Sequence, residues 1–237
     1  MKFIFNHLKK VISVLMLMSL FFTVSFSNAA TITSTTTGGT WSSGSTWVGG
    51  NVPATGDTVV IATTGTGAVN ISSNLTQTVT GSVTINNGAI LTTSGGTITF
   101  GAFTINSGGT ATIRRATTIL GTTTISGTLN FASTSGTSRL ITFTGDVTLN
   151  SGAVWTEPSS GNGANNTYKF GGNFANNAIT FNALGNGLHT FSGISKTISG
   201  SKATSIPFIT FTGAYTNSGI ISCAQTLTVT GVTLTNN

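Results

Sequence analysis

Apolar runs in this sequence are short, and Gly or Asn ends nearly every one of them after four to seven residues. An isolated helix needs more than about three uninterrupted turns, so these interruptions exclude long helices after residue 30. Apolar and polar residues alternate inside the runs, as in S-V-T-I from Ser82 to Ile85, which is typical of a strand with one buried face. Thr forms roughly a fifth of the chain and favours a pleated surface. The sequence therefore predicts an all-β protein.

The strand-like runs recur at fixed distances. Ile85, Ile105 and Ile125 end three of them at equal spacing, and polar turns that read N-N-G, N-S-G and S-G follow. The block F-G-G-N-F-A-N-N-A-I at 170–179 also aligns without a gap with F-T-G-A-Y-T-N-S-G-I at 211–220, an offset of twice that spacing plus one position. A period of about 20 residues, which the longer repeat doubles, is the size of one coil of a β-solenoid.

We therefore predict a right-handed parallel β-helix, or solenoid, with coils of about 20 residues. Asn and Gly tolerate the left-handed backbone of tight bends, and equal turns would stack so that Asn86, Asn106 and Asn150 form an amide ladder. Because some turn intervals also fit hairpins, an array of small antiparallel β-sandwich units is the alternative.

Residues 1–29 have the pattern of a signal peptide. Three lysines within the first ten positions precede an apolar run from Val11 to Phe26, and small residues up to Ala29 mark a cleavage site. We expect an extracellular protein, secreted or on the outer cell surface, without a membrane span in the mature chain. Residues 30–61 are predicted to form a cap and the first strand, and residues 62–237 the repeats. The sequence stops in mid-pattern, so further repeats are expected beyond Asn237.

The stretch T-W-V-G-G-N-V-P-A-T-G-D-T-V-V-I at 46–61 combines Trp, Pro and an acidic residue. We interpret it as part of the cap, because an uncovered solenoid end exposes strand edges that invite aggregation. Trp41, Trp47 and Val52 are expected to cover the first coil, and Pro53 to fix a bend. Asp57 has no second carboxylate near it in the sequence.

Charge is scarce, at 5% of the residues. Cleavage removes three of the nine basic residues and none of the three acidic ones, which lowers the net charge from +6 to +3. Arg114-Arg115 is the only adjacent basic pair of the mature chain, and the other cations, Arg139, Lys169, Lys196 and Lys202, are scattered along the sequence. Nucleic-acid binding needs clustered cations and is not expected.

Candidate catalytic groups are few. Glycoside hydrolysis needs paired carboxylates and a lyase needs a base beside a cation or metal, and Asp146 and Glu157 are the two acids close enough in sequence to approach one another. We interpret His189 as a surface residue and Cys223 as a small buried hydrophobic residue. No catalytic, cofactor-binding or metal-binding residue is assigned, and no cofactor is expected, because the chain repeats no Asp at the spacing of calcium β-rolls.

T-x-T pairs suggest a further alternative. Residues two apart on a strand share a face, so stacked pairs would form the flat hydroxyl and methyl lattice that ice-binding solenoids use. The pairs are Thr78/Thr80, Thr97/Thr99, Thr110/Thr112, Thr122/Thr124, Thr142/Thr144 and Thr226/Thr228.

Three stretches resemble a known group of proteins. G-T-W-S-S-G-S-T-W-V-G-G-N-V-P-A-T-G-D-T-V-V-I at 39–61 resembles the segment that opens many secreted β-helical proteins of Bacteroidetes-type bacteria, and is similar to the extracellular domain family named for its eight glycines. N-N-T-Y-K-F-G-G-N-F-A-N-N and H-T-F-S-G-I-S-K-T-I-S-G-S resemble the strand repeats of surface proteins and adhesins in that group. The resemblance implies display on the cell surface or release, often by type IX secretion, and a non-enzymatic repeat region.

We therefore expect a non-enzymatic secreted or cell-surface repeat protein, either an adhesin or a structural rod. Its Thr, Ser and Asn side chains offer hydrogen bonds to a polysaccharide or to a host or abiotic surface. The alternatives are a polysaccharide lyase or hydrolase of the β-helix type, or the spacer of such an enzyme, and the ice-binding solenoid.

Overall fold

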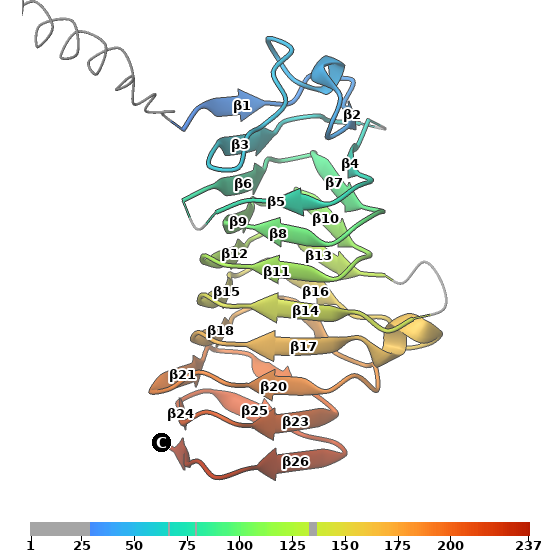
Figure 1. Cartoon of the computed structure of the whole chain (residues 1–237). Helices are drawn as coiled ribbons and strands as arrows, with labels where there is room; N and C mark the ends of the chain where they lie inside the picture. Colours follow the sequence, from blue (N-terminus) through green and yellow to red (C-terminus); the bar gives the residue numbers. More distant parts are fainter. Residues whose placement is uncertain (1–28, 66, 79, 133–136) are drawn as a thin grey trace, which may run out of the picture.

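Figure 1 shows a computed structural model of the chain, which describes residues 29–65, 67–78, 80–132 and 137–237. Its strands stack along one axis into a parallel β-solenoid. All pairs between the described strands are parallel, so the predicted solenoid is confirmed and the alternative array of antiparallel sandwiches is wrong. Helical structure in the described ranges is limited to two 3-10 turns, η1 (Gly44–Thr46) and η2 (Asn162–Asn165).

Successive coils contribute one strand to each of three faces, which we call the first, second and third sheets in chain order. The first sheet contains β1 (Thr31–Thr33), β3 (Thr58–Ile61), β6 (Ser82–Ile85), β9 (Ala102–Ile105), β12 (Thr123–Ile125), β15 (Val147–Leu149), β18 (Phe174–Asn176), β21 (Lys196–Ser199), β24 (Tyr215–Asn217) and β27 (Leu234–Asn236). The second sheet contains β2 (Gly39–Thr40), β4 (Val69–Ile71), β7 (Ile90–Thr93), β10 (Thr110–Ile113), β13 (Thr128–Phe131), β16 (Val154–Thr156) and β19 (Thr180–Asn182).

The third sheet contains β5 (Leu75–Thr76), β8 (Ile98–Phe100), β11 (Thr117–Ile119), β14 (Leu140–Phe143), β17 (Thr167–Phe170), β20 (His189–Phe191), β23 (Phe208–Phe211) and β26 (Thr226–Val229). In the last two coils a separate two-stranded sheet, β22 (Ala203–Ser205) with β25 (Ile220–Ser222), follows the first sheet in chain order in place of the second sheet.

Coil length varies around the predicted period. Asn86 and Asn106, which bond to each other across one coil, are 20 residues apart. Asp146 and Asn173, which do the same just before β15 and β18, are 27 residues apart. The additional part of the long coil lies between β16 and β17, where η2 is inserted at the corner of the second and third sheets. An insertion at a corner leaves the strands in register.

The rod is elongated along its strand stack. The ten strands of the first sheet give it a length of about 43 Å at about 4.8 Å a strand. Alternate side chains of every sheet point inward, so the core runs along the axis.

An aromatic column fills the third sheet, where Phe143, Phe170, Phe191 and Phe211 occupy paired positions. Their consecutive ring centroids lie 5.3, 4.9 and 5.1 Å apart. Stacked rings at such distances add about 0.5–1.5 kcal/mol a pair to their burial.

Turn residues stack as predicted, with one change. Asn106 Nδ2 donates to Asn86 Oδ1 at 3.1 Å, which confirms the first step of the amide ladder. Ser126 takes the next position, and Asn150 Nδ2 donates to Ser126 Oγ at 2.9 Å. The amide ladder is therefore formed in its first step, and Asn150 bonds to a hydroxyl group and not to Asn106.

The longer repeat seen in the sequence has a structural cause. Asn176 and Asn217 both end a strand of the first sheet with a buried amide side chain. The Oδ1 atom of Asn176 accepts from the backbone N–H of Ala178 at 3.1 Å, and that of Asn217 from the N–H of Gly219 at 3.2 Å. Each amide shapes the bend into the next strand by the same contact with the residue two positions on.

At the N-terminal end, the prediction for the two tryptophans is confirmed. Trp41 and Trp47 belong to the hydrophobic core at 5% and 2% exposure, and their rings meet edge to face at 5.0 Å. Trp47 Nε1 donates to the backbone oxygen of Trp41 at 2.7 Å. Pro53 is buried as well. The expected contribution of Val52 is wrong, because this residue is 41% exposed within the exposed turn 48–52.

Candidate functional site

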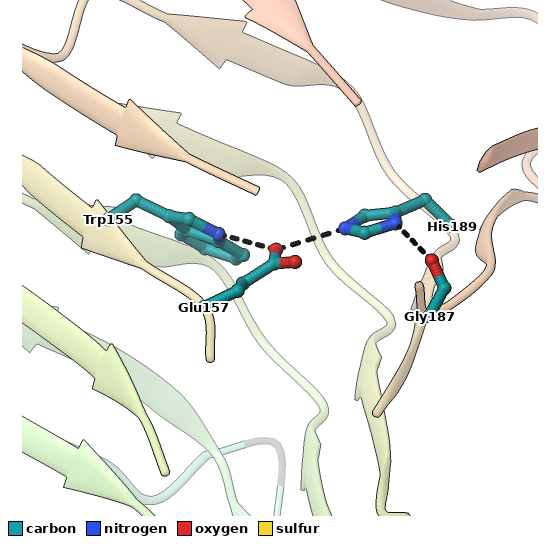
Figure 2. Close-up of polar contacts among 4 residues, drawn as sticks. All are labelled: Trp155, Glu157, Gly187 and His189. Carbon is teal, nitrogen blue, oxygen red and sulfur yellow. Dashed lines mark hydrogen bonds and ion pairs between the residues drawn. The ribbon is translucent and has the colours of Figure 1, made fainter. Parts of the chain in front are cut away.

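A polar cluster lies inside the solenoid where the second and third sheets meet (Figure 2). Glu157 follows β16, and His189 begins β20 in the next coil. Glu157 Oε1 accepts from Trp155 Nε1 at 2.7 Å and lies 2.9 Å from His189 Nε2. The other ring nitrogen, Nδ1, lies 3.1 Å from the backbone oxygen of Gly187. One carboxylate thus joins an indole and an imidazole that come from successive coils.

The acceptors around His189 decide how its ring is protonated. A backbone carbonyl can only accept, so Nδ1 carries a proton and donates to Gly187. A further proton lies in the hydrogen bond between Nε2 and Glu157 Oε1, so the two groups together carry no net charge whichever of them holds it. This pair is the one ion pair found among the described residues. Burial of such a pair is tolerated when hydrogen bonds satisfy both groups.

Aromatic rings seal this cluster from solvent. The ring of Tyr168 stacks on His189 at 4.6 Å with 20° between the planes. Burial, and then the negative charge of Glu157, raise the pKa of Tyr168 above its usual range. His189 is 0% and Glu157 4% exposed, so no substrate can reach them. The cluster holds two coils together and is not an active site in this arrangement.

The interpretation of His189 as a surface residue is therefore wrong. Its partner lies 32 residues earlier, and stacking of coils brings the two side chains together. Asp146 and Glu157, the two acids close enough in sequence to approach one another, are held apart. Asp146 lies before β15 in the first sheet, where its oxygens accept from the backbone N–H and the Nδ2 of Asn173 at 2.8 and 3.0 Å. The carboxyl groups thus serve different corners of the coil.

The third acid, Asp57, is structural too. Its two carboxylate oxygens accept from the backbone N–H groups of Ala30 and Ala54 at 2.8 and 2.7 Å. Asp57 thereby ties the beginning of the described chain to the turn before β3 and is 7% exposed. All three acids of the sequence are engaged in bonds that support the fold.

The outer faces carry regular columns of hydroxyl groups. The threonine column, as we call it, runs along the middle of the third sheet, and neighbouring strands place its members side by side. Its members are Thr76, Thr99, Thr118, Thr142, Lys169, Thr190, Thr210 and Thr228. A shorter column on the first sheet consists of Thr84, Thr104, Thr124 and Thr148.

The T-x-T pairs do not build the lattice of an ice-binding solenoid. Thr122/Thr124 lies along the first sheet, Thr110/Thr112 on the second and Thr97/Thr99 along the third. A flat lattice would need a second column of threonines beside the threonine column. At the position of Thr97, however, the next two strands of the third sheet carry Ala116 and Leu140.

Cys223 differs from its predicted burial. Its side chain is half-buried and its Sγ atom lies 3.2 Å from the oxygen of Pro207. It lines an open hollow of about 450 Å³ between the last strands, together with Ile221, Leu227 and Leu234. Leu227 is 49% exposed there because β26 is the last strand of its sheet.

Basic residues that are scattered in the sequence gather in space. Arg114 and Arg115 lie between β10 and β11, Arg139 directly precedes β14, and Lys169 belongs to β17. The strands β11, β14 and β17 are neighbours in the third sheet. Arg139 and Lys169, which are scattered in the sequence, therefore lie on strands next to the pair Arg114-Arg115, and we call these four residues the basic corner.

Acidic, His and Cys side chains are spread out over the described ranges. No group of three or more of them there is placed to hold a metal ion. No helix in that part of the chain is long and apolar enough to cross a membrane. The predicted signal peptide, residues 1–29, lies outside the described residues except for Ala29 and stays a prediction.

The fold and its faces define a parallel β-solenoid protein. Comparison with protein-family models, curated proteins and solved structures found no match to the chain. No residue role is therefore inherited from a relative.

Proposed function

We propose that the chain is a non-enzymatic, secreted or cell-surface solenoid that binds polysaccharide along its outer face, as an adhesin or a structural surface rod. The observation that carries this proposal is the threonine column, in which seven Thr and one Lys stand on eight neighbouring strands. Strands about 4.8 Å apart repeat the same hydroxyl group along the rod. A polymer of sugars presents hydroxyl groups repetitively too, and can hydrogen-bond to several coils at once.

The alternative of a polysaccharide lyase or hydrolase finds less support. Hydrolysis would need two carboxyl groups that flank a glycosidic bond in a cleft. Asp57, Asp146 and Glu157 are instead each bonded into separate parts of the fold. If the solenoid is only the spacer of an enzyme, the isolated rod should not bind polysaccharide. Binding by the isolated rod therefore distinguishes our proposal from this alternative.

Binding can be tested with purified residues 30–237 on immobilised cellulose, chitin, dextran and polygalacturonate, and on cultured cells. The informative variant replaces Thr99, Thr118 and Thr142 by Val, which keeps the branched shape and removes three hydroxyl groups of the threonine column. The control replaces Thr104, Thr124 and Thr148 by Val on the first sheet. All six residues are half-buried strand residues, so the two variants are matched.

We expect the third-sheet variant to bind at least about tenfold more weakly, which corresponds to about 1.4 kcal/mol, and the first-sheet control to bind like the wild type. Equal binding by all three proteins would assign adhesion to another surface. Absence of binding to every polymer and cell would count against the adhesin and leave the structural rod.

A further inference from the structure

Four of the six cations in residues 30–237 occupy three successive coils, three of them at the corner before the third sheet and the fourth, Lys169, within β17. Pairing of Thr117 with Ile141 sets the register of β11 and β14. Two residues before this pair, the same register places Arg115 beside Arg139, with their backbones about 4.8 Å apart. Lys169 lies one strand further but is displaced along β17, because it pairs with Thr142 and the position beside Arg139 is Asn166. Arg115 and Arg139 thus form a row along the axis of the solenoid, and Lys169 adds a charge about 10 Å away in the strand direction.

Nothing acidic in the described chain compensates this row. Asp57 and Asp146 are bonded on other parts of the coil. Glu157 does lie at the same corner, but its side chain points inward and is neutralised by His189. Since His189–Glu157 is the one ion pair among the described residues, the basic corner has no carboxylate partner there.

The guanidinium groups also keep hydrogen-bonding capacity. Arg115 Nε donates to the backbone oxygen of Ser94 at 2.7 Å, which anchors this side chain, and its terminal nitrogens make no hydrogen bond with described residues. Nε of Arg114 and of Arg139 is buried without a hydrogen-bond partner in the same ranges, so the terminal nitrogens of these two side chains are the ones left for a ligand. The three Arg side chains are half-buried. A planar guanidinium that faces solvent is matched to a carboxylate or sulfate, which it can bind with two parallel hydrogen bonds.

We propose that the basic corner binds an acidic polysaccharide, one that carries carboxylate or sulfate groups at regular intervals along the solenoid axis. This inference rests on the proposed function and specifies its ligand class. The row of Arg115 and Arg139, with Lys169 displaced along β17, supplies the charges, and the adjoining hydroxyl groups of Thr118 and Thr142 can bind sugar hydroxyls. Single-stranded nucleic acid fits less well, because the described surface exposes no aromatic ring on which a base could stack.

The test uses purified residues 30–237 and four soluble probes: polygalacturonate, heparin, neutral dextran and a single-stranded DNA. The variant replaces Arg115 and Arg139 by Gln, which removes two positive charges and keeps polar stems. The control replaces Lys196 and Lys202 by Gln, which removes the same charge from the beginning of β21 and the turn after it. Circular dichroism and thermal unfolding establish that both variants fold.

We expect the wild type to bind polygalacturonate or heparin more tightly than dextran, with affinity that falls as salt rises. The Arg115→Gln/Arg139→Gln variant should lose at least tenfold in affinity, and the lysine control less than about threefold. Equal losses in both variants would show a net-charge effect and overturn the inference. Tighter binding of the DNA than of both acidic polysaccharides at the same salt would overturn it in favour of a nucleic-acid site.

Failure here is distinguishable from failure of the proposed function. Binding of neutral polymers that depends on the threonine column, without binding of acidic ones, would reject the basic corner and keep the proposed function. Binding of acidic polymers that depends on Arg115 and Arg139, without any effect of the Thr→Val variants, would keep the basic corner and reject the threonine column as the contact face.

Discussion

The coils of residues 82–131 and those of residues 140–217 share the three faces of one solenoid, yet their interiors differ. The earlier coils are filled mainly by aliphatic side chains such as Val83, Ile85 and Leu91. The later coils hold a continuous set of rings around Trp155, together with the buried pair of Glu157 and His189. Their coil lengths also differ, because β9 follows β6 after a short coil and β18 follows β15 after a long one.

This comparison shows which parts of a solenoid tolerate changes in length and in side-chain type. Backbone pairing fixes the strands, so extra residues gather at a corner, as η2 does between β16 and β17. The interior is less constrained, because a column can change from aliphatic to aromatic from one coil to the next. Polar groups enter the core only where each finds a partner, as Glu157 does with Trp155 and His189.

Truncation of Trp155 should have the largest effect on stability. Its ring lies 4.7 Å from Phe131, 5.5 Å from Phe143 and 5.8 Å from Phe181, so Trp155→Ala leaves a large cavity and removes one of the two hydrogen bonds to Glu157 Oε1. We expect a loss of about 4–5 kcal/mol in the free energy of unfolding, measured with urea.

The matched change in the aliphatic coils is Leu91→Ala, which lies in the same inward column of the second sheet. It should cost about 2–3 kcal/mol because less surface is removed. An equal loss in the two variants would contradict the idea that the aromatic coils carry more of the stability.

The buried ion pair gives the second prediction. Glu157→Leu removes the acceptor of both Trp155 and His189 and leaves a buried imidazole without its partner. Breaking such a pair on one side should cost roughly 3 kcal/mol or more. The double variant Glu157→Leu/His189→Leu replaces the pair by apolar groups and should be more stable than the single variant by at least about 1 kcal/mol. A double variant that is less stable than the single one would refute the assigned pairing.

The same comparison explains what the sequence could predict. Regular turns at Asn86 and Asn106 established the period, and with it the solenoid, the alternating core and the ladder. Predictions that needed the register of a longer coil failed. The pair of His189 with Glu157 and the row of Arg115 with Arg139 both span coils that corner insertions lengthen beyond the regular period. No periodic signal in the sequence gives the length of such an insertion.

Alkaline pH should weaken the aromatic coils through Tyr215. Its hydroxyl group donates to the oxygen of Gly172 at 2.9 Å, and burial raises the pKa of Tyr215 from 10.0 to about 12. Because the folded state holds the proton more tightly than the unfolded state, its contribution is complete below about pH 10 and is lost as the pH rises through about 12. The loss is up to about 2–3 kcal/mol, since one pKa unit is worth about 1.4 kcal/mol.

The control for this prediction is Tyr215→Phe, which cannot ionise at that position. Urea unfolding at pH 8.5, 10 and 11.5 should show the wild type as the more stable protein at pH 8.5 and a shrinking difference at higher pH. A difference that stays constant would exclude Tyr215 as a source of alkaline sensitivity.

The smallest expected effect concerns the amide ladder of the regular coils. Asn106→Ala removes one side-chain hydrogen bond, to Asn86 Oδ1, at an exposed turn and should cost about 0.5–1.5 kcal/mol. Ser107→Ala, at the next exposed position of the same turn, should be neutral within about 0.5 kcal/mol. Asn177→Ala removes two hydrogen bonds, from the backbone N–H and the hydroxyl group of Ser201 across a longer coil, and should therefore cost more than Asn106→Ala. Equal losses at the two positions would show that the second of these bonds does not contribute to stability.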